Sequence, residues 1–329
     1  MRGFSACSKD DSGNQQQEPE YPSPTPVPSA DYKGLAFISS GESTVRLAQV
    51  GTPYEISLEY STDESHWKPY TIGETITLAD STFLLFRSGE HKNRKFSKDD
   101  ENYYHFEISG PISAQGNIIS LLNRDFSTPL TFYGFFALFE GCTSLLSAPE
   151  LPATTMEQGC YFRMFAECTG LKSAPELPAK ELAYNCYGWM FKGCSALTYV
   201  PDLPATEMVS YCYNNMFANC TSLKFAPELP ATRLDMGCYH CMFEGCTSLT
   251  SAPELPATEL VSNCYEFMYK DCRNLRYVIG LFTTEPSEKT TKDWLSGVAA
   301  SGTFIKSKKA TWDVTSAHGV PEGWKIETW

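Results

Sequence analysis

The sequence lacks several features that would place it in a familiar class of protein. It has no run of about 18 apolar residues, the length that a membrane-spanning helix needs, and its most apolar stretch, FYGFFALF at 132–139, is much shorter. Basic residues are in deficit, with 26 Lys and Arg against 39 Asp and Glu, which gives a net charge of −13. Because an acidic chain repels the phosphate backbone, we expect no nucleic-acid partner.

The residues of common active sites are also sparse. The 5 histidines are scattered, and no Ser-His-Asp, Cys-His or histidine-cluster pattern and no glycine-rich phosphate loop accompanies them. The one C-x-x-C pair, Cys238 and Cys241, lacks the second ligand pair of a zinc site. We therefore predict a protein that is not an enzyme and that binds no metal and no cofactor.

The first 30 residues resemble the start of a bacterial surface lipoprotein. Small residues in FSAC precede Cys7, as they precede the lipidated cysteine of such proteins, and the acidic pair at 10–11 resembles the signal for the outer face of the outer membrane in gut Bacteroidetes. The basic and apolar regions expected before them are missing, which leaves a ragged terminus with an incidental cysteine as the alternative. The proline-rich segment 12–30 predicts an extended spacer. We assign 1–30 as signal remnant and linker.

Residues 31–112 follow a period of two. Apolar residues at 54, 56, 58 and 60 alternate with Glu and Ser, and similar short runs lie at 83–87 and 103–108 between polar turns. Short alternating strands of this kind predict one antiparallel β-sandwich domain.

From residue 142 onward a period of 26 residues takes over. Near copies of SAPELPATEL begin at 147, 173, 199, 225 and 251, and one column of cysteines stands at 142, 168, 194, 220, 246 and 272. Such a period predicts a solenoid, in which each repeat buries its apolar side against its neighbours. We assign 113–280 to this solenoid and 281–329, where the pattern stops, to a C-terminal cap.

Each repeat is predicted to contain a strand, a proline turn and a helix. Leu171, Ala174 and Leu177 mark the extended part, and the two prolines near its end stop ladder pairing. The apolar residues that follow, at 182, 186, 187, 190 and 191, fit one face of a helix of about three turns, and Gly193 fits its C-terminal turn. The predicted fold class is therefore α+β.

The repeats resemble the BspA-like leucine-rich repeats of bacterial surface proteins. The turn Met242-Phe243-x-x-Cys246 matches that family's Ala-Phe-x-x-Cys turn, and Leu249 matches its leading leucine, over about 116–280. The family's repeat is shorter, however, and has Leu or Ile where Ala174 stands. The resemblance implies a curved solenoid with parallel strands on its concave side, a role in adhesion or recognition at the cell surface, and no shared chemistry.

Two further sets of repeated residues, the cysteines and an acidic column, could take part in chemistry. The repeat cysteines are predicted to be free thiols, because Cys160 and Cys168 would lie about 12 Å apart along a helix, beyond the reach of a disulfide. The acidic column at 150, 176, 202, 228 and 254 is either a solvated ladder, which we favour, or a calcium ladder.

The candidate binding face follows from strand alternation. If Leu171 and Ala174 face the core, the column just before Ala174 faces outward, and it contains Tyr199, Phe225 and Tyr277 among serines. The preceding column carries Lys172, Lys224 and Arg276. Exposed aromatic rings beside cations are typical of recognition surfaces, although incidental variety on a sheet would give the same pattern.

We therefore expect a monomeric, outward-facing outer-membrane lipoprotein, held to the membrane by its lipid anchor only. It would bind a host or microbial protein through the concave face. The alternatives are an accessory glycan-binding protein at the surface and, less favoured, an enzyme with a hidden site.

Overall fold

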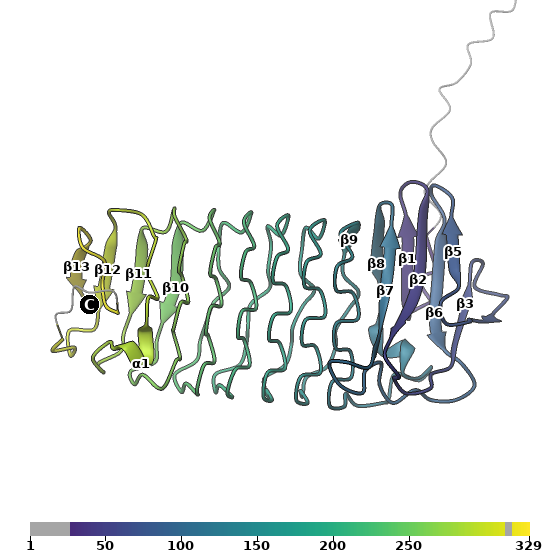
Figure 1. Ribbon diagram of the computed structural model, residues 1–329, viewed down its shortest axis with the longest axis horizontal. Helices are drawn as coiled ribbons and strands as arrows, with labels where there is room; N and C mark the ends of the chain where they lie inside the picture. Colours follow the sequence, from purple (N-terminus) through teal and green to yellow (C-terminus); the bar gives the residue numbers. More distant parts are fainter. Residues whose placement is uncertain (1–26, 313–317) are drawn as a thin grey trace, which may run out of the picture.

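The computed structural model describes residues 27–312 and 318–329 and shows a row of stacked coils with an antiparallel β-domain at one end (Figure 1). Cys7 and most of the predicted linker lie outside the described residues. Strands account for 24% of the chain and helices for 3%. The predicted α+β class is therefore wrong, because the repeats contain no helices.

The N-terminal part consists of two sheets, whose strands pair antiparallel except where β8 meets β9 of the first coil. One has the order β4-β3-β6-β1-β8-β9 and the other the order β5-β2-β7. Their bounds are β1 (Leu35–Ser39), β2 (Ser43–Val50), β3 (Leu58–Ser61), β4 (Lys68–Pro69), β5 (Thr75–Leu78), β6 (Phe83–Ser88), β7 (Tyr103–Ser109), β8 (Ile112–Gln115) and β9 (Leu145–Ser147). The short 3-10 helix η1 (Ile118–Leu121) follows β8.

No break separates this part from the solenoid. The predicted boundary after residue 112 falls inside β8, which pairs in parallel with β9 of the first coil, Ile112 opposite Leu145. One hydrophobic core runs through both parts, from Leu35 in β1 to Trp324 near the C-terminus. The β-domain thus closes the N-terminal end of the solenoid and shares its core.

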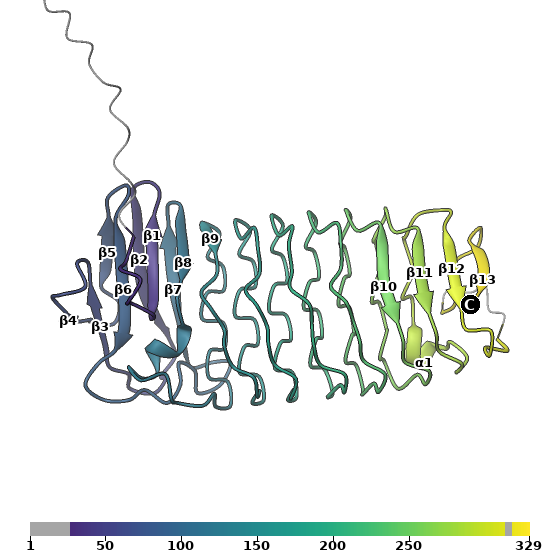
Figure 2. The ribbon, with the colours of Figure 1, turned by 180° about the vertical axis from the view of Figure 1, so that it is seen from behind.

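The coils stack side by side along the molecule (Figure 2), and backbone hydrogen bonds join neighbouring coils. Ser173 pairs with Tyr199, Glu207 with Arg233 and Phe225 with Ser251, so partners are 26 residues apart. Where pairing is longer, the coils contain the strands β10 (Ser251–Leu255) and β11 (Tyr277–Gly280). The sequence period is therefore the length of one coil.

A series of tight turns occupies the segment predicted to be helical. In 183–194 alternate residues make bonds of two kinds. The N–H groups of Cys186, Met190 and Cys194 donate to carbonyls three residues back. Those of Tyr187 and Phe191 donate to Cys212 and Met216 in the next coil, at 3.0 and 2.9 Å. A helix would direct all of these donors four residues back, so the backbone here bonds the coils to one another.

This turn ladder explains the spacing that we assigned to a helix. Its buried residues recur as pairs at an exact step of four, 186 and 187, then 190 and 191, whereas a helix has 3.6 residues per turn. Every fourth residue has positive φ: Asn185 (55°), Trp189 (58°) and Gly193 (77°). That conformation is easiest for Gly and Asn, and inter-coil bonds hold the bulkier residues in it.

Stacked aromatic rings fill the core between coils. The ring of Phe191 lies parallel to that of Phe165, with centroids 5.6 Å apart, and to that of Phe217, 5.7 Å apart. A second column stacks Tyr187 on Tyr213 at 5.8 Å. All five side chains are buried. Because each ring packs against the equivalent ring of its neighbours, no coil has a complete core of its own.

The C-terminal tail extends the solenoid. The short helix α1 (Glu288–Thr291) is followed by β12 (Thr303–Lys306) and β13 (Lys325–Thr328), which continue the parallel sheet in the order β10-β11-β12-β13. Trp294 packs on Tyr265 with ring centroids 6.1 Å apart and so continues the aromatic column. Charged residues in the edge strand β13, Lys325 and Glu327, oppose pairing with another sheet.

Candidate functional site

The three predicted aromatic residues are exposed on the parallel sheet. Tyr199 is 57% exposed, Phe225 69% and Tyr277 39%, whereas Leu197 and Leu223, two residues before the first two, are fully buried. Ser251 pairs with Phe225 on one side and Tyr277 on the other, which places the column in register across the coils. We call this column, with Ser147, Ser173 and Ser251, the aromatic column. The exposure of the three rings agrees with the predicted outward orientation, but the segment does not alternate strictly, because buried Leu197 and exposed Tyr199 are two residues apart.

The three predicted cations lie beside this column. Lys172, Lys224 and Arg276 are exposed, and none of them makes an ion pair within 4.0 Å in the part of the chain that the structure describes. They occupy equivalent positions in their coils. Backbone hydrogen bonds join these positions between coils, as from Thr198 N–H to the Lys172 carbonyl at 3.0 Å, and so keep the three side chains on the same face. Their charges are thus available to a partner.

The cysteines are buried and inert. All 12 cysteines in the described residues are free thiols, and Sγ of Cys220 donates to the Phe191 carbonyl at 3.1 Å, a contact that recurs from coil to coil. Burial raises the pKa of Cys246 to about 12, so its thiolate does not form near neutral pH. Such thiols fill the core and make poor nucleophiles.

The distance argument for free thiols does not hold, although the thiols are free. No helix separates Cys160 from Cys168, and Tyr161 N–H bonds directly to the Cys186 carbonyl in the next coil at 3.1 Å. Hydrogen-bonded neighbours in a sheet lie about 4.8 Å apart, which is within disulfide range. The distance between cysteines therefore does not explain why the thiols are reduced.

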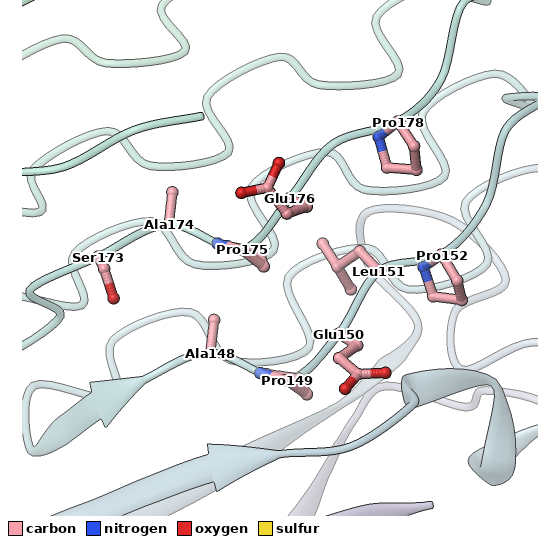
Figure 3. A pocket seen from close by; sticks show the side chains of 10 residues that line it. All are labelled: Ala148, Pro149, Glu150, Leu151, Pro152, Ser173, Ala174, Pro175, Glu176 and Pro178. Atoms are coloured by element: carbon pink, nitrogen blue, oxygen red, sulfur yellow. The ribbon is translucent and has the colours of Figure 1, made fainter. Parts of the chain in front are cut away.

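A groove lies at the proline corner, where the SAPELPA segments of the first two coils run side by side (Figure 3). It has a volume of about 560 Å³, and its lining includes Pro149, Pro175, Glu150 and Glu176. The prolines lack N–H groups, and the pairing of the two coils resumes only at the bridge between Thr155 and Glu181, where Met156 N–H donates to the Glu181 carbonyl at 3.0 Å. Lost pairing opens the groove.

The carboxylates of the acidic column are not arranged as the ligands of a metal ion. Within residues 27–312 and 318–329, no group of three or more His, Cys, Asp or Glu side chains is placed to hold a metal ion. Glu150, Glu176, Asp202 and Glu228 are exposed to solvent. The structure thus gives the calcium ladder no support.

Sequence reasoning missed a cationic pocket at the junction of the β-domain and the first coil. Its lining residues are Tyr54, Glu55, Lys92, Arg94, Lys95 and Thr131, and its volume is about 460 Å³. We call it the junction pocket. The signal was present as HKNRK at 91–95, a cationic run in a chain of net charge −13, but the aromatic and threonine partners are distant in sequence.

Among the described residues, no helix is long and apolar enough to cross a membrane. Comparisons of the chain with protein-family models, with curated proteins and with solved structures found no match.

Proposed function

We propose that this protein is a recognition module of the cell surface, which binds a partner protein through the sheet face that carries the aromatic column. The observation that carries the proposal is the exposure of Tyr199, Phe225 and Tyr277 on one column of hydrogen-bonded coils.

The aromatic rings are not needed for folding. Serine occupies the same column at 147, 173 and 251, in coils with the same buried columns. Exposed rings bury little surface within the fold, so their contribution must come from elsewhere. Aromatic side chains in the centre of an interface commonly contribute about 2 kcal/mol or more each.

Charge favours a protein partner with acidic groups opposite this face. Lys224 is adjacent in sequence to Phe225, as Arg276 is to Tyr277, on a chain that is acidic overall. Unpaired cations beside aromatic rings can pair with carboxylates at the rim of an interface while the rings fill apolar pockets. Anchoring through a lipid on Cys7, with the segment 12–30 as spacer, would present this face away from the membrane.

A capture experiment tests the proposal. The purified chain is immobilised beside a variant in which all three aromatic residues are replaced by Ser, and both are exposed to extracellular host and microbial proteins and to a glycan array. Tyr184→Ser is the matched control, because Tyr184 is 44% exposed but lies in the turn ladder.

We expect one or more proteins to bind the wild type and the control but not the triple variant. Glycan binding that the triple variant loses would instead favour the glycan-binding alternative. Equal capture by the wild type, the control and the triple variant would refute the role of the aromatic column.

A further inference from the structure

The junction pocket combines free positive charge with exposed aromatic rings in a chain that is otherwise acidic. Lys92, Arg94 and Lys95 line it together with a single acid, Glu55. Lys92 makes an exposed ion pair with Asp125 at 3.4 Å. In the described ranges, Arg94 and Lys95 have no carboxylate within 4.0 Å. Two cations therefore remain for a ligand.

The loop that carries these cations is fixed by buried contacts. Asn93 is 4% exposed. Its carboxamide accepts from Ser57 N–H at 2.8 Å and donates to the carbonyls of Ser57 and Leu121 at 2.9 and 2.7 Å. Three residues later, Phe96 is buried, and its ring stacks on Phe135 at 5.8 Å. The two anchors hold the intervening Arg94 and Lys95 in place, so a ligand would not have to order this loop.

Aromatic faces flank the central cation. The Nζ atom of Lys95 lies 4.7 Å from the ring centroid of Tyr54 and 5.7 Å from that of Phe132. Tyr54 is 47% exposed and Phe132 42%. The backbone of Tyr54 is held by the Tyr104 hydroxyl, which donates to its carbonyl at 2.7 Å. Two partly exposed rings thus lie beside one ammonium group, Tyr54 in the lining of the pocket and Phe132 next to Lys95.

We infer that the junction pocket binds an acidic saccharide, a pyranose that bears a carboxylate or a sulfate group. The anionic group would pair with Lys95 and Arg94, and the C–H face of the sugar ring would pack on Tyr54 or Phe132, because the negative face of an aromatic ring attracts polarised C–H groups. The volume of about 460 Å³ lies within the range of small-ligand sites. The rings favour a sugar over an acidic peptide, whose carboxylates need cations but no flat apolar face.

This site is independent of the proposed protein-binding face. It lies between the β-domain and the first coil, whereas the first aromatic residue of the aromatic column, Tyr199, lies in a later coil. Variants at one site therefore leave the other intact, and either inference can fail alone.

Titration calorimetry on the full chain tests the inference with five probes. Tetragalacturonate supplies carboxylates and a heparin-derived tetrasaccharide supplies sulfates. Maltotetraose is the neutral sugar, hexaglutamate the acidic peptide, and sodium sulfate the bare anion. We expect at least one acidic saccharide to bind at millimolar concentration or below, and maltotetraose, hexaglutamate and sulfate to bind at least about 10-fold more weakly.

Single substitutions assign the binding to the pocket. Lys95→Gln and Tyr54→Ala should each weaken the binding of the acidic saccharide about 10-fold, the equivalent of one good contact. Their controls are Lys98→Gln, an exposed cation outside the pocket, and Tyr184→Ala, which should leave affinity unchanged. Binding by only one acidic saccharide identifies the anionic group. The inference is overturned if neither acidic saccharide binds, if hexaglutamate or sulfate binds as well, or if the pocket variants behave as their controls do.

Discussion

Mild alkali should unfold this protein abruptly, because its core contains many thiols that can ionise only after unfolding. Burial raises the pKa of Cys186, Cys246 and Cys264 from 9.0 to about 12. A group whose pKa is raised in the folded state stabilises that state fully below its unfolded pKa. The contribution is lost as pH rises from that value toward the folded pKa. The vulnerable window therefore starts near pH 9.

The magnitude follows from proton linkage. Between pH 9 and pH 10, a thiol with an unfolded pKa of 9.0 that stays protonated in the fold loses about 1 kcal/mol of stabilisation. For the 12 buried thiols together this is about 12 kcal/mol, as much as the whole stability of an ordinary domain. The buried tyrosine hydroxyls, such as that of Tyr213, also have raised pKa values, and they add to the effect at higher pH.

Urea unfolding, followed by circular dichroism with a phosphine reductant present, measures this loss from pH 7.5 upward. We expect the free energy of unfolding to be constant below about pH 8 and to fall steeply above pH 9. Cys246→Ala should reduce the slope near pH 10 by about 1.2 kcal/mol per pH unit, whereas Thr250→Ala, which removes no titrating group, should leave it unchanged. A flat profile between pH 8 and pH 10 would refute the argument, as would rapid reaction of the native thiols with a disulfide reagent.

The remaining predictions concern the aromatic columns, the coil as a unit and the anchor. Phe191→Ala should lower the free energy of unfolding by about 3–5 kcal/mol, because the ring is fully buried between its neighbours, and a neutral effect in urea unfolding would contradict the packing. Deleting 194–219, one whole coil, should leave a folded and shorter protein in size-exclusion chromatography and circular dichroism, since its flanking coils present matching columns. Tyr213→Phe should raise stability by up to about 1 kcal/mol, because its buried hydroxyl has no hydrogen-bond partner in the described residues; a clear loss in thermal unfolding would show that the hydroxyl is bonded. Cys7→Ser, in a precursor with a complete signal, should move the protein from the membrane to the soluble fraction, and an unchanged membrane pool would count against the lipid anchor.

The coil length and the outward-facing column could be predicted from the sequence. The exact 26-residue repetition fixes which residues lie opposite one another, as in Ser173 opposite Tyr199. Leu171 and Ala174 are both buried, with exposed Lys172 between them, although residues three apart would face opposite sides of a strictly alternating strand. Both predictions depend on local pattern and on stacking, which do not change with the conformation of the rest of the coil.

The helix could not be excluded by the same reasoning, because a step of four is close to the helical step of 3.6. The signal that distinguishes turns from a helix appears when equivalent positions of different coils are compared. Positions 185 and 193 have positive φ, and their equivalents in other coils are often Gly, Asn or Asp, as at Asn219, Gly237 and Asn263. These residues suit single left-handed positions and weaken helices. Comparing coils by conformational preference, in addition to hydrophobicity, would have indicated turns.

The junction pocket was beyond prediction for a different reason. Its cations are adjacent in sequence, but Tyr54 and Thr131 come from segments more than 30 residues away on either side. Their proximity depends on how the β-domain closes onto the first coil, where Phe96 N–H donates to the Gly134 carbonyl at 2.7 Å. Such a contact has no counterpart in the repeat pattern.

The central claim, that the aromatic column is the recognition face, is tested most directly by affinity. A protein captured by the wild type is purified, and its dissociation constant is measured for the wild type, for the variant with Ser at 199, 225 and 277, and for Tyr184→Ser. The account predicts a loss of at least about 30-fold for the triple variant, with an unchanged melting temperature and no effect of Tyr184→Ser. An unchanged dissociation constant for the folded triple variant would contradict it.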